Sequence, residues 1–226
     1  MMIEIVENKL WVQRMKLTFF GLEIGTRMTV IRLAGDSLFI HSPISLDIKL
    51  KQELDRIGRV DFVVSPNKMH HFFIADYMQG YPAALVFASP GLPEKRKDVA
   101  FKYLLKDNPE NQWAHYLGQK IFYCGEDFRE VVFFHRETRT LIVADLIMNF
   151  RENTAFLTKL VLKVVGSYNK PISPVDTGLT ANQKAMAAAS LEYILGWDFD
   201  RIILAHGDII ETGGKKVLSE LFFWLN

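Results

Sequence analysis

Three short apolar runs constrain the fold of this chain more than any other feature of its sequence. They read VDFVV, TLIVA and RIILA. Apolar runs of about four to eight residues, rich in β-branched side chains, are typical of strands buried inside a sheet. A side chain able to bind a metal follows each run: His70 and His71 after the first, Asp145 after the second and His206 after the third. Because sites in open α/β sheets form at the carboxyl ends of strands, we expect these side chains to lie along one edge.

The order of the predicted elements indicates the fold class. Residues 10–41 read as strands, with Gly35-Asp36 as a short hairpin turn. Leucines then recur at helical spacing between Ser45 and Gly58. A strand, a helix beginning at the tandem histidines and a further strand follow, which is the pattern of a βαβ unit. We expect an α/β (α+β) fold in one domain over residues 1–226, with two sheet layers and helices outside them.

The composition argues against several classes of protein. Lysine and arginine number 27 against 26 acidic residues, a net charge of +1 without the basic excess of a nucleic-acid-binding protein. The single cysteine, Cys124, excludes an internal disulfide framework and fits a reducing compartment. We see no signal peptide and no apolar run long enough to cross a membrane. We expect a soluble, cytoplasmic protein that binds a small-molecule substrate and neither nucleic acid nor membrane, in an oligomeric state that the sequence leaves open.

His70, His71, Asp145 and His206 form a candidate metal site. Two or three imidazoles with one carboxylate suit one divalent ion, zinc first, with iron or manganese as alternatives. Taken singly, a histidine at a strand end is more often a hydrogen-bonded structural residue, and an aspartate there often caps a helix. Their recurrence at three strand ends favours a site. His41, which also ends a predicted strand, either lines the same cavity, hydrogen-bonds a ligand residue or only shapes a turn.

The order of these motifs resembles the metallo-β-lactamase-like hydrolase superfamily over nearly the whole chain. Asp145 in LIVADL matches the bridging aspartate of that family, and His206 in IILAHG matches its last histidine. The family's first motif, T-H-x-H-x-D-H, corresponds to SPNKMHH, where only His71 matches and His70 replaces the aspartate. The pattern also resembles an uncharacterised branch that shares SPN…HH, HR…TLIVADL and AHGD stretches. The resemblance implies a four-layer αββα sandwich with a metal site at one edge.

The departures from the first motif have a chemical consequence. Pro66 and Lys68 stand where the family has its first two histidines. Proline offers no ligand and a lysine ammonium repels a cation, so one of the two metal positions of the family should be lost. The residues that would serve the remaining position are His70, His71, Asp145 and His206.

The hypothesis that follows is a metal-dependent hydrolase with a mononuclear site and an ester, amide, thioester or phosphodiester substrate. Asp145, or Glu126 if it reaches the site, would orient or deprotonate the water, and Lys68 would stabilise an oxyanion if it points inward. One alternative is a catalytically inactive pseudoenzyme that acts as a binding or interaction module. Another is a redox protein with iron on the same ligands. The sequence leaves open whether residues 90–118 form a lid over the site.

Overall fold

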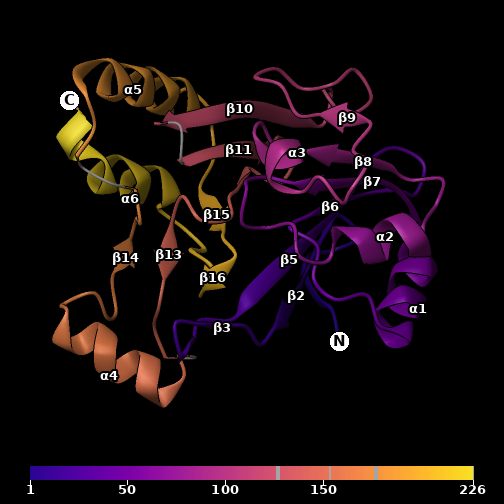
Figure 1. The fold of residues 1–226 in the computed structure, drawn as a ribbon, viewed down its shortest axis with the longest axis horizontal. Coiled ribbons are helices and arrows are strands. Elements are labelled where there is room, and N and C mark those ends of the chain that lie inside the picture. The colour runs from indigo at the N-terminus through magenta and orange to yellow at the C-terminus, as the bar shows by residue number, and fades with distance from the viewer. Residues whose placement is uncertain (126–127, 153, 176–177, 226) are drawn as a thin grey trace.

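The larger of the two main β-sheets is built from the first half of the chain (Figure 1). The computed structural model describes residues 1–125, 128–152, 154–175 and 178–225. The seven strands, in spatial order, are β1 (Ile3–Val6), β2 (Leu10–Met15), β5 (Thr26–Arg32), β6 (Ser37–His41), β7 (Arg59–Ser65), β8 (Leu85–Ala88) and β9 (Tyr103–Leu104). Pairing is antiparallel from β1 to β6 and parallel from β6 to β9. The predicted hairpin is confirmed, because β5 and β6 pair on either side of Gly35-Asp36.

Two helices connect the parallel strands of this sheet. Helix α1 (Ile48–Ile57) begins after Asp47, whose carboxylate accepts from the Leu50 N–H. Helix α2 (Ile74–Gly80) joins β7 to β8 and completes the predicted βαβ unit. It begins four residues later than predicted, because the Asn67 side chain accepts the N–H groups of Met69 and His70 and favours a turn there. The tandem histidines therefore lie in the turn between β7 and α2.

The second sheet comes from the C-terminal half of the chain. Its strands are β10 (Leu117–Cys124), β11 (Phe128–His135), β12 (Thr140–Ile142) and β15 (Arg201–Ile203). The first three pair antiparallel in chain order, and β12 pairs parallel with β15. A small sheet of β14 (Pro171–Ile172), β13 (Met148–Asn149) and β16 (His206–Gly207) lies beyond the ends of β12 and β15.

The two large sheets pack face to face, and helices cover their outer faces. Phe39 and Val64 of the first sheet share a buried cluster with Phe133 and Ile203 of the second. Leu54 of α1 and Tyr77 of α2 are buried against the outer face of the first sheet. The helices over the second sheet are α5 (Ala181–Leu195) and α6 (Gly214–Leu221). The architecture is the predicted four-layer αββα sandwich.

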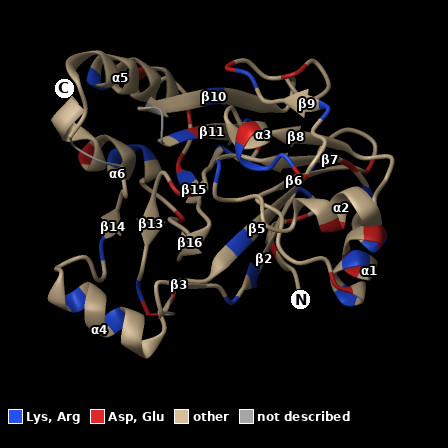
Figure 2. Cartoon of the chain, in the orientation of Figure 1, with Lys and Arg blue, Asp and Glu red and all other residues tan. Residues whose placement is uncertain are grey.

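The remaining elements lie at the periphery. They are the hairpin strands β3 (Thr18–Phe19) and β4 (Leu22–Glu23), and the helices α3 (Leu92–Lys95), α4 (Phe156–Val164) and η1 (Phe223–Leu225). Charged side chains of both signs lie on α1, whereas the charged side chains of α4 are all basic (Figure 2). Within the described ranges, no helix is both long and apolar enough to cross a bilayer.

Candidate metal centre

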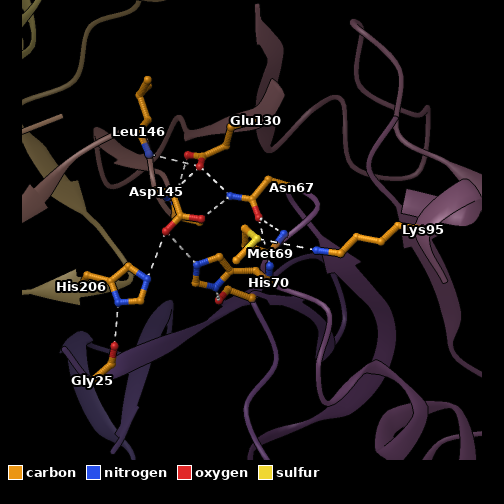
Figure 3. A network of polar contacts seen from close by, with 11 residues as sticks. Gly25, Asn67, Met69, His70, Lys95, Glu130, Asp145, Leu146 and His206 are labelled. Carbon is orange, nitrogen blue, oxygen red and sulfur yellow. Dashed lines mark hydrogen bonds and ion pairs between the residues drawn. The ribbon is translucent and has the colours of Figure 1, made fainter. Parts of the chain in front are cut away.

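Three of the four predicted ligands converge at one edge of the sandwich (Figure 3). The Asp145 Oδ1 atom lies 3.2 Å from His70 Nε2 and 3.1 Å from His206 Nε2. One ligand atom from each residue lies within 4.8 Å of the other two, and all three residues are buried. In the described part of the chain, these three are the one group of three or more histidine, cysteine or acidic residues that lie close enough together to hold an ion.

The strands deliver these residues to the same edge. His70 follows β7, Asp145 follows β12 and His206 opens β16. Because β12 and β15 run parallel and in register, the segments that follow them leave the sheet side by side. Beyond that point the β13–β16 pairing places Met148 opposite His206. The strand ends thus bring together three of the four side chains that were expected along this edge.

Both imidazoles are fixed through the ring nitrogen that faces away from Asp145. The Nδ1–H of His206 donates to the Gly25 carbonyl oxygen at 2.6 Å. The Nδ1 atom of His70 lies 2.6 Å from the Ser42 Oγ atom. A histidine held in this way at Nδ1 presents Nε2 to a metal in a fixed orientation. The two contacts therefore orient the rings as in a ligand pair.

Asn67 connects the aspartate to a second, buried carboxylate. Its Nδ2 atom donates to Asp145 Oδ2 at 2.8 Å and to Glu130 Oε2 at 2.9 Å. Its Oδ1 atom accepts the backbone N–H groups of Met69 and His70. One amide thus holds both the turn that carries His70 and the carboxylate that faces it.

Glu130, on β11, fixes the backbone on which Asp145 stands. Its carboxylate accepts the N–H groups of Ala144, Asp145 and Leu146 at 2.6–3.1 Å. Burial, together with the neighbouring Asp145 charge, raises the pKa of Glu130 to about 7. All of its contacts donate to it, so the site is built around its ionised form.

The electrostatics of the three residues favour an ionised aspartate. Burial alone would raise the pKa of Asp145, but the imidazoles of His70 and His206 outweigh it and lower that pKa well below its usual range. Burial opposes protonation of His70, and Asp145 outweighs it, so the pKa of His70 is raised. A carboxylate that attracts positive charge this strongly is a suitable partner for a cation.

Arg27 holds the segment that carries His206. Its guanidinium donates to the carbonyl oxygens of Leu204 and Gly207, which flank the histidine. Burial lowers the pKa of Arg27 to about 10, which still leaves it charged at neutral pH. Charge-assisted bonds to two carbonyls of a short loop limit its movement.

His71 lies outside the group. The Arg96 Nη1 atom lies 2.8 Å from His71 Nδ1. Because a guanidinium only donates, Nδ1 accepts and Nε2 carries the proton, which leaves no lone pair there for a metal. Burial and the charges of Lys95 and Arg96 lower the pKa of His71 to about 4, so the ring is neutral. The structure thus brings His70, Asp145 and His206 together without the fourth predicted ligand.

The other candidates from the sequence lie in different places. His41 is buried with its ring edge-on to Phe133, and its Nε2 atom has no hydrogen-bond partner among the described residues. Lys68 packs its side chain near Gly91, and its carbonyl oxygen accepts from Lys95 at 2.7 Å. Glu126 lies outside the described residues. No described residue between 90 and 118 lines the pocket at the site, so this segment does not act as its wall.

An apolar pocket of about 240 Å³ opens onto the three residues. Its walls include Leu17, Phe19, Ile24, Met69, Phe72 and Phe128. His70, Asp145 and His206 also line it, together with Thr26 and His71. The site is therefore reachable by a small molecule.

A comparison with protein families identifies the chain. The family described as Domain of unknown function (DUF4336) matches residues 7–165. The chain belongs to the DUF4336 family. That match ends before His206, so the last residue of the group lies beyond the matched region of this DUF4336 chain. No curated protein matches the sequence.

Solved structures support the fold of this DUF4336 chain. The mono-zinc form of the metallo-β-lactamase FIM-1 from Pseudomonas aeruginosa superposes with a TM-score of 0.66 and 11% identity, covering 98% of this chain and 93% of that one. The metallo-β-lactamase DIM-1 gives 0.67 and 14%, covering 100% and 98%. The Flv1 flavodiiron core from Synechocystis sp. PCC6803 gives 0.68 and 13%, covering 100% and 60%. The DUF4336 chain thus has the metallo-β-lactamase fold predicted from the resemblance.

Sequence reasoning missed the residues that support the three ligands. Ser42, Asn67 and Glu130 each make a contact described above, and none was singled out. Glu130 gave a detectable signal, since it is an acid beside the apolar run VVFF. Asn67, directly after a strand and a proline, was a recognisable turn residue. Ser42 gave no signal, because its partner lies 28 residues away.

Proposed function

We propose that this protein is a metal-dependent hydrolase that uses a single divalent ion held by His70, Asp145 and His206. The observation that carries the proposal is the pair of Nε2 atoms 3.1–3.2 Å from one carboxylate oxygen, with each Nδ1 engaged elsewhere. Two histidines with purely structural roles would not need to direct their Nε2 atoms at the same carboxylate oxygen.

The spacing of the donors suits zinc. Ligand atoms placed tetrahedrally at about 2.0–2.2 Å from an ion lie about 3.3–3.6 Å apart, slightly more than the 3.1–3.2 Å from Asp145 Oδ1 to the two Nε2 atoms. Two imidazoles and one carboxylate leave a fourth position for water, as catalytic zinc sites do. Iron or manganese would accept the same ligands.

A bound ion of this kind lowers the pKa of its water to about 7 and supplies a nucleophile at neutral pH. The chain's own residues have separate tasks. Asp145 ligates or accepts a hydrogen bond through Oδ1, while Asn67 holds its Oδ2. Ser42 and the Gly25 carbonyl keep the imidazoles aligned. In the hydrolysis, water adds to the electrophilic centre, the bond to the leaving group breaks, and the leaving group departs with a proton from that water.

A second candidate is a pseudoenzyme that uses the fold as a binding module. The observation that favours it is that His70, Asp145 and His206 are already hydrogen-bonded to one another. Such a network satisfies its buried polar groups without an ion. Metal content separates the two candidates, and redox-active iron in place of zinc would point instead to electron-transfer chemistry.

The test is elemental analysis of matched variants. Asparagine removes Nε2 of a histidine but leaves an amide near the position of Nδ1, so His70→Asn, His206→Asn and His71→Asn each keep the Nδ1 contact. We expect one zinc per chain in the wild type and in His71→Asn, and at least a tenfold loss in the other two. No metal in the wild type after reconstitution would overturn the hydrolase proposal. A loss in all three variants would restore His71 as a ligand.

A further inference from the structure

We propose that the substrate is an uncharged ester or thioester with an apolar acyl group of about six to ten carbons, which lies in the pocket beside the metal centre. This inference rests on the proposed function, because the bond to be cleaved must meet the three ligands. It adds the substrate class, which the metal site alone leaves open.

The walls of the pocket are the first observation. Leu17, Phe19 and Ile24 come from the segment around the β3–β4 hairpin, Met69 and Phe72 from the turn that carries His70, and Phe128 from the start of β11. Three separate segments thus contribute apolar side chains to one space. Pockets that bind small molecules combine such walls with a few polar groups, and here these are the three residues of the candidate metal site with Thr26 and His71.

The charge of the pocket is the second observation. No lysine or arginine lines it in the described ranges, whereas Asp145 does. Arg96 is nearby, but it is directed at His71 Nδ1 and at Asp98. The divalent ion of the proposed centre would balance a charge at the bond to be cleaved, but a charge elsewhere on the acyl group would lie between apolar walls without a counter-charge, which is costly. An uncharged acyl group has no such penalty.

The size of the pocket sets the length of the acyl group. A cavity of about 150 Å³ binds benzene, which has six carbons, so by proportion a cavity of about 240 Å³ accommodates about eight to ten carbons. An acyl chain of about eight carbons therefore fits the space. Burying each methylene strengthens binding by roughly fourfold, which makes chain length a sensitive probe.

Two aromatic side chains extend the apolar surface to the mouth of the pocket. Phe19 is 47% exposed and Phe72 is 57% exposed, although both line the pocket. Large exposed aromatic side chains beside a pocket are typical of a ligand site, because the ligand removes them from water. They are also suitable positions for substitution, since an exposed residue is dispensable for folding.

The reaction is a hydrolysis that needs no further reactant. Water adds to the acyl carbon, the bond from that carbon to oxygen or sulfur breaks, and the alcohol or thiol leaves with one proton. The acid product then ionises. A charged carboxylate is poorly accommodated by apolar walls, which favours its release.

The experiment compares three probes on the zinc-loaded protein: p-nitrophenyl octanoate, p-nitrophenyl butyrate and the anionic bis(p-nitrophenyl) phosphate. We expect kcat/KM for the octanoate to exceed that for the butyrate at least tenfold, and to exceed that for the phosphodiester by more. The metal-free protein gives a readout besides activity. It should bind 2-decanone at least tenfold more tightly than 2-pentanone.

A matched pair of variants locates the effect. Phe72→Ser should lower the octanoate-to-butyrate ratio at least fivefold. Phe223→Ser removes an exposed phenylalanine of η1 (72% exposed, against 57% for Phe72) that does not line the pocket, and the ratio should stay at its wild-type value.

The outcomes separate this inference from the proposed function. Zinc-dependent hydrolysis with a preference for butyrate or the phosphodiester would overturn the substrate class and leave the hydrolase proposal standing. Absence of hydrolysis of every probe, with tight binding of 2-decanone, would overturn the hydrolase proposal and support an apolar ligand site. Equal binding of the two ketones would overturn the inference whatever the activity.

Discussion

Two buried serines near the candidate site differ in whether the hydroxyl has a partner. The Ser42 Oγ atom lies 2.6 Å from His70 Nδ1, whereas the Ser65 Oγ atom has no hydrogen-bond partner in the described part of the chain. We expect Ser42→Ala to weaken zinc binding by about 10–100-fold, because the imidazole loses the contact that orients it. Ser65→Ala should leave zinc affinity within about twofold of the wild type. Titration calorimetry on both variants would check this, and equal affinities would refute the role given to Ser42.

At the residue scale, the sequence could predict the ligands better than their supports. His70, Asp145 and His206 were found because each follows an apolar run, which is a local pattern. The hydrogen bond between Asn67 and Glu130 joins residues 63 positions apart in the chain. It depends on how the two sheets pack, which a local sequence pattern cannot predict. For His71, in contrast, the local pattern predicted a ligand that the structure does not place in the group. Its neighbour in sequence, His70, is a proposed ligand, but the ring of His71 lies against Arg96, 25 residues away.

At the scale of elements, the short pairing of β13 with β16 is the most constrained part of the site. Gly207 has a φ of +97°, and a Cβ atom there would lie 2.1 Å from the Asn149 carbonyl oxygen. The same segment is tied by the Asp208 N–H, which donates to that oxygen at 2.7 Å. Close approach of two backbones is thus what places His206.

We expect Gly207→Ala to lower the free energy of unfolding by about 3 kcal/mol or more, because backbone must move to make room. Gly166 is the control, since it also has a positive φ of +68° but open space around the Cβ position. Gly166→Ala should cost only about 1 kcal/mol. Urea denaturation measures both, and similar losses would contradict the assignment of the effect to the Asn149 contact.

The sequence predicted most elements but not all of their boundaries. The hairpin at Gly35-Asp36 and the βαβ unit were readable, because turn chemistry and hydrophobic period are local. The start of α2 was wrong by four residues because a side-chain contact of Asn67 competes with the helix. The β13–β16 sheet was also missed, since strands of two residues carry no periodic pattern.

At the scale of the whole molecule, buried neutral histidines make stability depend on pH. His135 is buried, and burial lowers its pKa to about 4, with Glu137 and Lys9 as the facing charges and Thr138 bonded to its Nδ1. The unfolded chain has a histidine pKa of about 6.5. Between these values the unfolded state binds more protons, so stability rises with pH there and is lost as pH falls.

We expect His135 to contribute about 2–3 kcal/mol to the loss of stability between pH 7 and pH 4. The free energies of unfolding of the wild type and of His135→Asn, compared at both pH values, isolate that contribution. The difference between the two proteins should shift by this amount in favour of the variant at pH 4. A difference that is the same at both pH values would mean that His135 titrates alike in the folded and unfolded chains.

The sandwich gives the function proposed for this chain its physical basis. The two packed sheets, each covered by helices on its outer face, hold the ends of β7 and β12 and the start of β16 together at one edge. The apolar pocket opens at that edge. That edge keeps candidate ligands although the first motif of the superfamily is largely absent. His70 follows β7, Asp145 follows β12 and His206 opens β16, and one ligand atom from each lies within 4.8 Å of the other two.

The decisive measurement is a crystal structure of the zinc-soaked protein with anomalous data collected on both sides of the zinc edge. We expect one anomalous peak per chain, at about 2.0–2.2 Å from His70 Nε2, His206 Nε2 and an Asp145 carboxylate oxygen. His71 should keep its contact with Arg96. No peak at these three residues, or a peak that includes His71 in place of one of them, would contradict the metal centre described above.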